Sequence, residues 1–166
     1  DIISRLNISA DRVRTIYLAA DPKFTNRVDP IDYAVLRKHH DLPEDYVLYL
    51  GGFDARKNIE AALQTYTWAQ GALGDSFPLV IAGNLPDRHD AFFHDPRVIA
   101  KQIEVENVVR FIGPVAEEDK VALYQQARAF LYPSIYEGFG LPALEALACG
   151  VPVVGSNASS IPEIVG

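Results

Sequence analysis

The apolar residues of the chain fall into short runs, and a helical pattern follows most of them. Runs that are apolar throughout, without alternation, are typical of strands buried on both faces of a sheet. They predict strands at residues 13–18, 46–52, 77–83, 107–113, 128–133 and 151–156. Amphipathic patterns and capping residues predict helices at residues 30–40, 58–73, 92–106, 116–127, 141–149 and 161–166, the third of them starting near Pro96.

Strand and helix therefore alternate along the chain. This predicts an α/β fold with a Rossmann-like, doubly wound and mostly parallel sheet. Such sheets bind ligands in a crevice outside the carboxyl ends of their strands. The segments to examine are those that directly follow a predicted strand, at residues 51–58, 83–87, 113–115, 134–141 and 156–160.

The segment after the strand at residues 46–52 combines glycines with two cations. Gly51 and Gly52 allow a ligand to approach the backbone closely, and Arg56 and Lys57 directly precede the next predicted helix. Cations beside the free N–H groups of a helix start form an anion site. The alternative is that Arg56 and Lys57 are only solvated surface charges.

The segment after the strand at residues 128–133 holds two carboxylates, Glu137 and Glu145, with seven residues between them. Gly138 and Gly140 predict a loop with positive φ, and Pro142 suits the first turn of the following helix. A carboxylate accepts two hydrogen bonds side by side, and the vicinal hydroxyls of a ribose or hexose offer two donors in that arrangement. The alternative is that Glu137 is solvated and that Glu145 only favours its helix start.

Together these features indicate a sugar-nucleotide or dinucleotide ligand, although the usual G-x-G-x-x-G fingerprint after the first strand is missing. The net charge of -7 argues against general nucleic-acid binding and against anionic membrane surfaces. The single cysteine, Cys149, excludes an internal disulfide and fits a reducing cytoplasm. The 166 residues suit one domain, and the lack of Met even at position 1 predicts a piece of a longer polypeptide.

The stretch "EGFGLPALE" resembles the E-x7-E signature of the family-4 (group 1) glycosyltransferases, which have the two-lobed GT-B fold. The stretches "YLGGFDARKN", "VVRFIGPV" and "ALYQQARAFLYPSIYEGFGLPALEALACGVPVVGSNASSIPEIVG" are similar to that family too. The resemblance implies that residues 1–166 are a single nucleotide-sugar binding domain. It would be the carboxy-terminal donor domain of a retaining glycosyltransferase, without the amino-terminal acceptor domain.

In that family an arginine and a lysine after the first strand of this domain hold the phosphates, and the two glutamates contact the donor sugar and the ribose. The resemblance therefore assigns Lys57 to the phosphates, Glu137 to the sugar and Glu145 to the ribose. Gly52 stands where many members have the arginine, so Arg56 is expected to supply the second cation. The expected catalytic residues are Arg56, Lys57 and Glu137, and the expected substrate-binding residues are Gly51, Gly52, Gly138, Phe139, Gly140, Leu141 and Glu145.

The implied reaction is transfer of a hexose from a nucleotide-sugar, with a mild preference for GDP-mannose, to a glycan or lipid-linked acceptor. The isolated domain is expected to be inactive, and the full-length protein to be cytoplasmic or peripheral to the membrane. No nucleic-acid partner is expected, given the net charge. No cofactor or metal is expected, because the histidines form no convincing ligand set: His39, His40, His89 and His94. The alternatives are a catalytically silent nucleotide-sugar binding module, a flavodoxin-like interaction domain and a sugar-nucleotide epimerase.

Overall fold

The computed structural model describes residues 2–25, 27–69 and 76–166. Within them the chain builds a five-stranded sheet in the order β3-β2-β1-β4-β5, and each neighbouring pair is parallel. The predicted α/β fold with a Rossmann-like, doubly wound sheet is confirmed. Each strand lies inside a predicted apolar run: β1 (Val47–Leu50), β2 (Leu79–Ala82), β3 (Val109–Gly113), β4 (Ala129–Tyr132) and β5 (Val153–Gly155).

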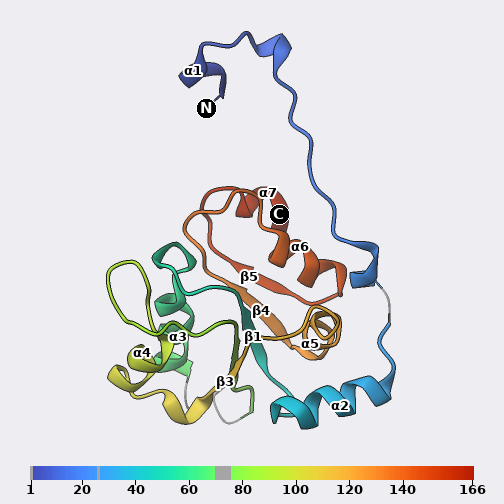
Figure 1. Cartoon of the computed structure of the whole chain (residues 1–166), viewed down its shortest axis with the longest axis vertical. Coiled ribbons are helices and arrows are strands. Elements are labelled where there is room, and N and C mark those ends of the chain that lie inside the picture. Colours follow the sequence, from blue (N-terminus) through green and yellow to red (C-terminus); the bar gives the residue numbers. More distant parts are fainter. Residues whose placement is uncertain (1, 26, 70–75) are drawn as a thin grey trace.

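Helices cover both faces of the sheet (Figure 1). One layer consists of α3 (Ile59–Ala69) and α4 (Pro96–Gln102), and the other of α2 (Pro30–His40), α5 (Lys120–Gln126), α6 (Leu141–Ala148) and α7 (Ile161–Val165). Successive strand residues face opposite layers, as the pleat requires. In β4, Leu131 packs against the first layer, whereas Phe130 and Tyr132 pack against the second. The side chain of Tyr132 therefore lies on the same side of the sheet as α5 and α6.

Two capping residues explain where helices begin. The carboxylate of Asp95 accepts a hydrogen bond from the N–H of Arg97 (2.9 Å), and Pro96 occupies the first turn of α4. Gly140 precedes α6 with a φ of 115°, a left-handed value that favours glycine. Of the two loop glycines, Gly140 uses the positive φ that glycine allows, and Gly138 does not.

Gly83 determines how closely the ends of β1 and β2 approach each other. A Cβ at this position would lie 2.1 Å from the carbonyl oxygen of Gly51, and the φ of 142° also favours glycine. The N–H of Gly51 donates to the carbonyl of Ala82 (3.1 Å). Close backbone contacts therefore help to fix this edge of the sheet, from which the loops of the site begin.

The predicted strand at residues 13–18 is wrong. The segment has no strand structure and runs away from the sheet as an extended arm (Figure 1). Ile16, Tyr17 and Leu18 are 81%, 63% and 53% exposed. An apolar run becomes a strand only where a neighbouring strand pairs with its backbone groups, and no described strand lies beside this one.

The helix boundaries differ less from the prediction. The helix α2 spans the predicted residues, whereas α5 starts at Lys120 instead of residue 116. Residues 70–73 of the helix predicted at 58–73 lie outside the described residues. Several elements are too short for the apolar pattern to predict them: α1 (Ile2–Leu6) and the 3₁₀ helices Ala10–Arg12, Pro22–Thr25, Ala55–Lys57 and Glu106–Val108.

Candidate functional site

The strand order reverses between β1 and β4, which makes their shared carboxyl edge the expected ligand site of such a sheet. The loops after these strands, residues 51–58 and 133–140, are joined there. The N–H of Ile135 donates to the carbonyl of Arg56 (2.8 Å). The side-chain amide of Asn58 donates to the carbonyl of Pro133 (3.2 Å). The two loops therefore form one continuous edge.

Lys57 and Glu137 bring the charges of the two loops together. Lys57 ends a 3₁₀ helix, and Asn58 turns the chain with a φ of 50°. The Nζ of Lys57 lies 2.6 Å from Oε1 of Glu137, and the two side chains are only 19% and 11% exposed. The structure thus joins two predicted catalytic residues that stand 80 positions apart in the chain.

Glu137 is held as an anion by its hydrogen-bond donors. Burial alone would raise the pKa of Glu137, but the ion pair with Lys57 and the hydrogen bond from Ser134 lower that pKa below the ordinary glutamate value. Lys57 Nζ also lies 6.0 Å from the ring centroid of Tyr132, within the range of a cation–π interaction. Sequence reasoning missed Ser134 and Tyr132 as site residues, and their only signal is their position at the end of a strand.

Arg56 forms its ion pair within its own loop, with Asp54. Its side chain is 55% exposed, and its Nε lies 2.8 Å from Oδ1 of Asp54. This hydrogen bond raises the pKa of Arg56. The expected role of Arg56 as the second phosphate cation stays a prediction, because the guanidinium would have to exchange Asp54 for the ligand. Asp54 and Arg56 stand two positions apart in the sequence, and this short spacing is the signal that could have predicted their pairing.

The remaining predicted substrate-binding residues surround the same edge. A Cβ at Gly52 would lie 3.7 Å from the carboxylate of Asp54, an ordinary contact, so packing alone does not require glycine there. The carbonyl of Phe139 accepts a hydrogen bond from Ser160 (2.7 Å). Leu141 begins α6 and is 41% exposed. The roles of these residues in binding a substrate stay predictions.

Glu145 lies in the second turn of α6 and contacts α5. Its Oε2 accepts a hydrogen bond from the hydroxyl of Tyr124 (3.2 Å). Burial raises the pKa of Glu145 above the ordinary value, and the Tyr124 bond and the charges of Lys120 and Lys23 offset this only in part. The carboxylate is therefore half-buried, and among the described residues Tyr124 donates a hydrogen bond to it.

Tyr132 connects the surroundings of the two glutamates. Its pKa is raised by burial and by the negative charges of Glu137 and Glu145. Its side chain is almost fully buried, at 3% exposure. The charges of both carboxylates predicted from the sequence thus act on one buried tyrosine at the end of β4.

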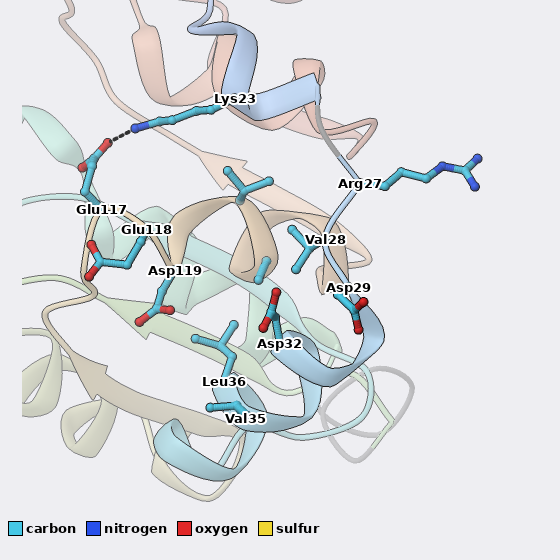
Figure 2. Close-up of a pocket in the computed structure, with 12 residues that line it drawn as sticks. Lys23, Arg27, Val28, Asp29, Asp32, Val35, Leu36, Glu117, Glu118 and Asp119 are labelled. Atoms are coloured by element: carbon cyan, nitrogen blue, oxygen red, sulfur yellow. Dashed lines mark hydrogen bonds and ion pairs between the residues drawn. The ribbon is translucent and has the colours of Figure 1, made fainter.

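A cavity of about 890 Å³ lies between Lys23, residues 27–29, α2 and the start of α5 (Figure 2). Figure 2 shows the ammonium of Lys23 reaching Glu117 at 3.0 Å, and Glu117 also pairs with Lys120 at 2.5 Å. Four further carboxylates line the cavity: Asp29, Asp32, Glu118 and Asp119. A diphosphate is disfavoured in such a negative field. This cavity is therefore a poorer phosphate site than the edge at Lys57.

The part of the chain that the structure describes contains no group of three or more His, Cys, Asp or Glu side chains placed to hold a metal ion. The expectation that the protein needs no metal or cofactor stays a prediction. No described helix combines the length and the apolar character needed to cross a membrane.

Residues 35–166 match the family described as Glycosyl transferases group 1, and they include the whole sheet and both loops of the site. The chain belongs to this family. Over its whole length this group 1 glycosyltransferase chain is 39% identical to the O-antigen chain mannosyltransferase B of Escherichia coli, of which it covers 42%.

Two solved structures place the group 1 chain within a larger fold. The sucrose-phosphate synthase of Thermosynechococcus elongatus matches 96% of it, with 29% identity, a TM-score of 0.74 and 39% of that chain covered. HepE of Anabaena in complex with UDP-glucose matches 95% of it, with 23% identity, a TM-score of 0.72 and 42% of that chain covered. The chain thus spans about two fifths of the length of these relatives. Its resemblance to the carboxy-terminal lobe of a GT-B glycosyltransferase is confirmed.

Proposed function

We propose that this group 1 glycosyltransferase chain is the donor domain of a retaining hexosyltransferase and binds a nucleotide-sugar between β1 and β4. The observation that carries the proposal is the Lys57–Glu137 ion pair at the reversal of strand order. Separating a partly buried ion pair costs free energy unless each charge finds a new partner. A diphosphate supplies a partner for Lys57, and the hydroxyls of a sugar supply donors for Glu137.

The two glutamates give the bound ligand a direction. With the diphosphate at Lys57, the sugar lies on the side of Glu137 and the nucleoside on the side of Glu145. A carboxylate has about four acceptor positions, and the bond from Tyr124 uses one of those of Glu145. Glu145 therefore keeps the capacity to accept from the 2′ and 3′ hydroxyls of a ribose.

The reaction breaks the bond between the anomeric carbon of the sugar and the diphosphate oxygen, and the electron pair leaves with the diphosphate. Lys57 stabilises the negative charge that develops there, as do the N–H groups at the start of α6 after Gly140. Arg56 contributes after it exchanges Asp54 for a phosphate. The acceptor hydroxyl bonds to the anomeric carbon on the face that the diphosphate leaves, and its proton passes to the departing diphosphate oxygen, so the configuration is retained.

The proposed donor is GDP-mannose. Its support is the 39% identity, over the whole chain, to a protein named as a mannosyltransferase. The proposed acceptor is a glycan or a lipid-linked sugar, held in the whole protein by an amino-terminal domain. Because the donor domain supplies only one side of the cleft, we expect these 166 residues to bind the donor without transferring sugar.

The test is calorimetric titration of the chain with GDP, GDP-mannose and UDP-glucose. We expect GDP and GDP-mannose to bind, and Lys57→Ala to weaken GDP binding by about tenfold to a hundredfold, the range for a hydrogen bond to a charged group. Lys101→Ala, which removes an exposed lysine from α4, is the matched control and should bind GDP like the wild type.

The other outcomes distinguish the alternatives. Absence of binding by every nucleotide would contradict the proposal and favour a flavodoxin-like interaction domain. Nucleotide binding by the chain, combined with no sugar transfer by the whole protein, would favour a catalytically silent binding module. Turnover by the 166 residues alone would contradict the division of the cleft between two domains.

A further inference from the structure

The loop after β5, residues 156–160, is hydrogen-bonded to the loop that carries Glu137. The hydroxyl of Ser159 donates to the carbonyl of Glu137 (2.8 Å) and accepts from the N–H of the same residue (3.2 Å). The hydroxyl of Ser160 lies 2.7 Å from the carbonyl of Phe139 and 3.2 Å from that of Glu137. Side chains of one loop thus satisfy the backbone of the other, on both sides of the glutamate.

Ser159 makes its hydrogen bonds to Glu137 from a backbone conformation that is unfavourable in free energy. Its φ is 56°, in the left-handed region that residues with a Cβ seldom adopt. Glycine would adopt the same φ without that cost. A hydroxyl, however, donates to a carbonyl and accepts from an N–H through the same oxygen atom, and glycine has no side chain to do so. The hydroxyl of Ser159 therefore has a use that glycine could not supply.

One residue of the Glu137 loop, Gly138, has no packing contact within the part of the chain that the structure describes that would order it. Gly138 is exposed, and a Cβ built there would meet no atom of the described residues within 4 Å. Glycine also loses more conformational freedom on ordering than other residues. Ser156 supports the same loop one step earlier, because its hydroxyl donates to the carbonyl of Ser134, whose side chain bonds to Glu137.

The opposite side of the loop is held by the segment after β1. There Ile135 donates to Arg56 and the amide of Asn58 donates to Pro133. The carboxylate of Glu137 meets Lys57 of this segment at 2.6 Å. The Glu137 loop is therefore hydrogen-bonded to two segments, the one after β1 and the serine loop after β5.

We propose that Ser159 and Ser160 are positioning residues of the transferase site. Their hydroxyls fix the backbone of residues 137–139, so that the carboxylate of Glu137 stays beside Lys57 and directed at the donor sugar. The inference rests on the proposed function only for its last step, the contact with the sugar. The effect on the backbone and on the Lys57 pair is independent of any ligand.

The first experiment uses the 166-residue chain without nucleotide, followed by NMR. The variants are Ser159→Gly, Ser160→Ala and the two combined. Ser159→Gly removes the hydroxyl and relieves the backbone strain, so the fold should be retained. We expect the amide of Glu137 to exchange its hydrogen about tenfold faster in the combined variant. The pKa of its carboxyl group should move up, towards the ordinary glutamate value.

Two controls separate positioning from a general loss of hydroxyl contacts. Ser160→Thr retains a hydroxyl and should keep the wild-type exchange and titration of Glu137. Thr67→Ala removes a hydroxyl that donates to the carbonyl of Gln64 (2.8 Å) on α3, and it should leave Glu137 unaffected. The proposal is overturned if the combined variant shows the wild-type exchange rate and the wild-type titration of Glu137.

The second experiment compares GDP with GDP-mannose by calorimetry. In the combined variant the affinity for GDP-mannose should fall about threefold to tenfold, while the affinity for GDP stays within about twofold. An equal loss for both nucleotides would mean a merely structural role and would overturn the positioning role. If the wild-type chain binds neither nucleotide, the proposed function fails, and the NMR experiment still decides whether the serines hold Glu137.

Discussion

Glu137 and Glu145 stand on one short segment of the chain, yet their surroundings shift their pKa values in opposite directions. Hydrogen bonds from Lys57 and Ser134 outweigh burial at Glu137, so its pKa is lowered. At Glu145 burial outweighs the hydrogen bond from Tyr124, so its pKa is raised. The two carboxylates differ mainly in the donors that they meet, rather than in being buried.

The cations near the two carboxylates are used differently. Lys57 pairs directly with Glu137 at 2.6 Å. Lys23 and Lys120, which lie near Glu145, pair with Glu117 instead, at 3.0 and 2.5 Å. An anionic ligand therefore finds its cation in the Glu137 region, whereas the Glu145 region offers an acceptor for neutral hydroxyl groups. This difference fits a diphosphate on one side and a ribose on the other.

The largest effect should come from removing the cation of the Glu137 region. In the whole enzyme we expect Lys57→Ala to lower kcat by about 10² to 10³, which is typical for one donor aimed at a developing charge. Lys57→Arg should lose less, because a positive charge remains. Steady-state kinetics of the three proteins give the comparison. Equal rates for the wild type and Lys57→Ala would show that the lysine is only a surface charge.

The next effect should separate the two carboxylates by ligand. Glu145→Ala should weaken binding of a nucleoside diphosphate by about one to two decades, since a hydrogen bond to a charged partner contributes about 1.5–3 kcal/mol. Glu137→Ala should hardly change that affinity but should impair transfer in the whole enzyme. Calorimetry with GDP and its 2′-deoxy analogue measures the binding of both variants.

The same titrations can also contradict the assignment of Glu145 to the ribose and of Glu137 to the sugar. If Glu145→Ala binds GDP and the 2′-deoxy analogue as tightly as the wild type, Glu145 does not contact the ribose. If Glu137→Ala is the variant that loses affinity for the bare diphosphate, the two carboxylates have exchanged roles.

Residues 13–18 and 46–52 show how far apolar patterning predicts this fold. Both segments look like strands, but only the second becomes one, β1, because parallel neighbours pair with it on both sides. The first has the composition of a strand, but no described strand lies beside it, so its apolar side chains stay exposed. Patterning reports that a segment suits a sheet, and pairing partners decide whether it joins one.

The contacts of the site likewise divide into those that the sequence predicts and those that it does not. Lys57 and Glu137 were predictable as neighbours because the carboxyl ends of parallel strands meet at one edge. The bond from Tyr124 to Glu145 depends on how α5 packs against α6, which no local pattern encodes. The left-handed φ of Ser159 was hidden for another reason, since a serine gives no signal of that conformation, whereas a glycine would.

A smaller effect should follow from removing the donor of the Glu145 region. Tyr124→Phe deletes the hydroxyl that lowers the pKa of Glu145, so that pKa should rise further above the ordinary value. Carbon-13 NMR titration of the carboxyl group measures it. Tyr46→Phe is the matched control, because it deletes a buried hydroxyl that bonds to the carbonyl of Leu123 on the same helix (2.8 Å). Equal titration of Glu145 in both variants would contradict a direct role of Tyr124.

The smallest effects should appear in the pH dependence of stability, where the two glutamates act with opposite signs. The pKa of Glu137 is lower in the folded chain than the ordinary value of about 4.3. Its stabilising contribution is therefore complete above that value and is lost as the pH falls through the folded pKa. The pKa of Glu145 is higher in the folded chain, so its ionisation costs stability as the pH rises from about 4.3 through that raised pKa.

Glu137→Gln and Glu145→Gln remove these two contributions one at a time. As the pH rises through the window around about 4.3, Glu137→Gln should become less stable relative to the wild type, because only the wild type gains the ionised carboxylate and its donors. Over the same rise Glu145→Gln should become more stable relative to the wild type, because only the wild type ionises a buried carboxylate with few donors. Urea unfolding of the three chains at a series of pH values gives the two difference curves. Difference curves with the same slope would mean that burial governs both carboxylates alike, and that the donors around Glu137 do not distinguish the two regions.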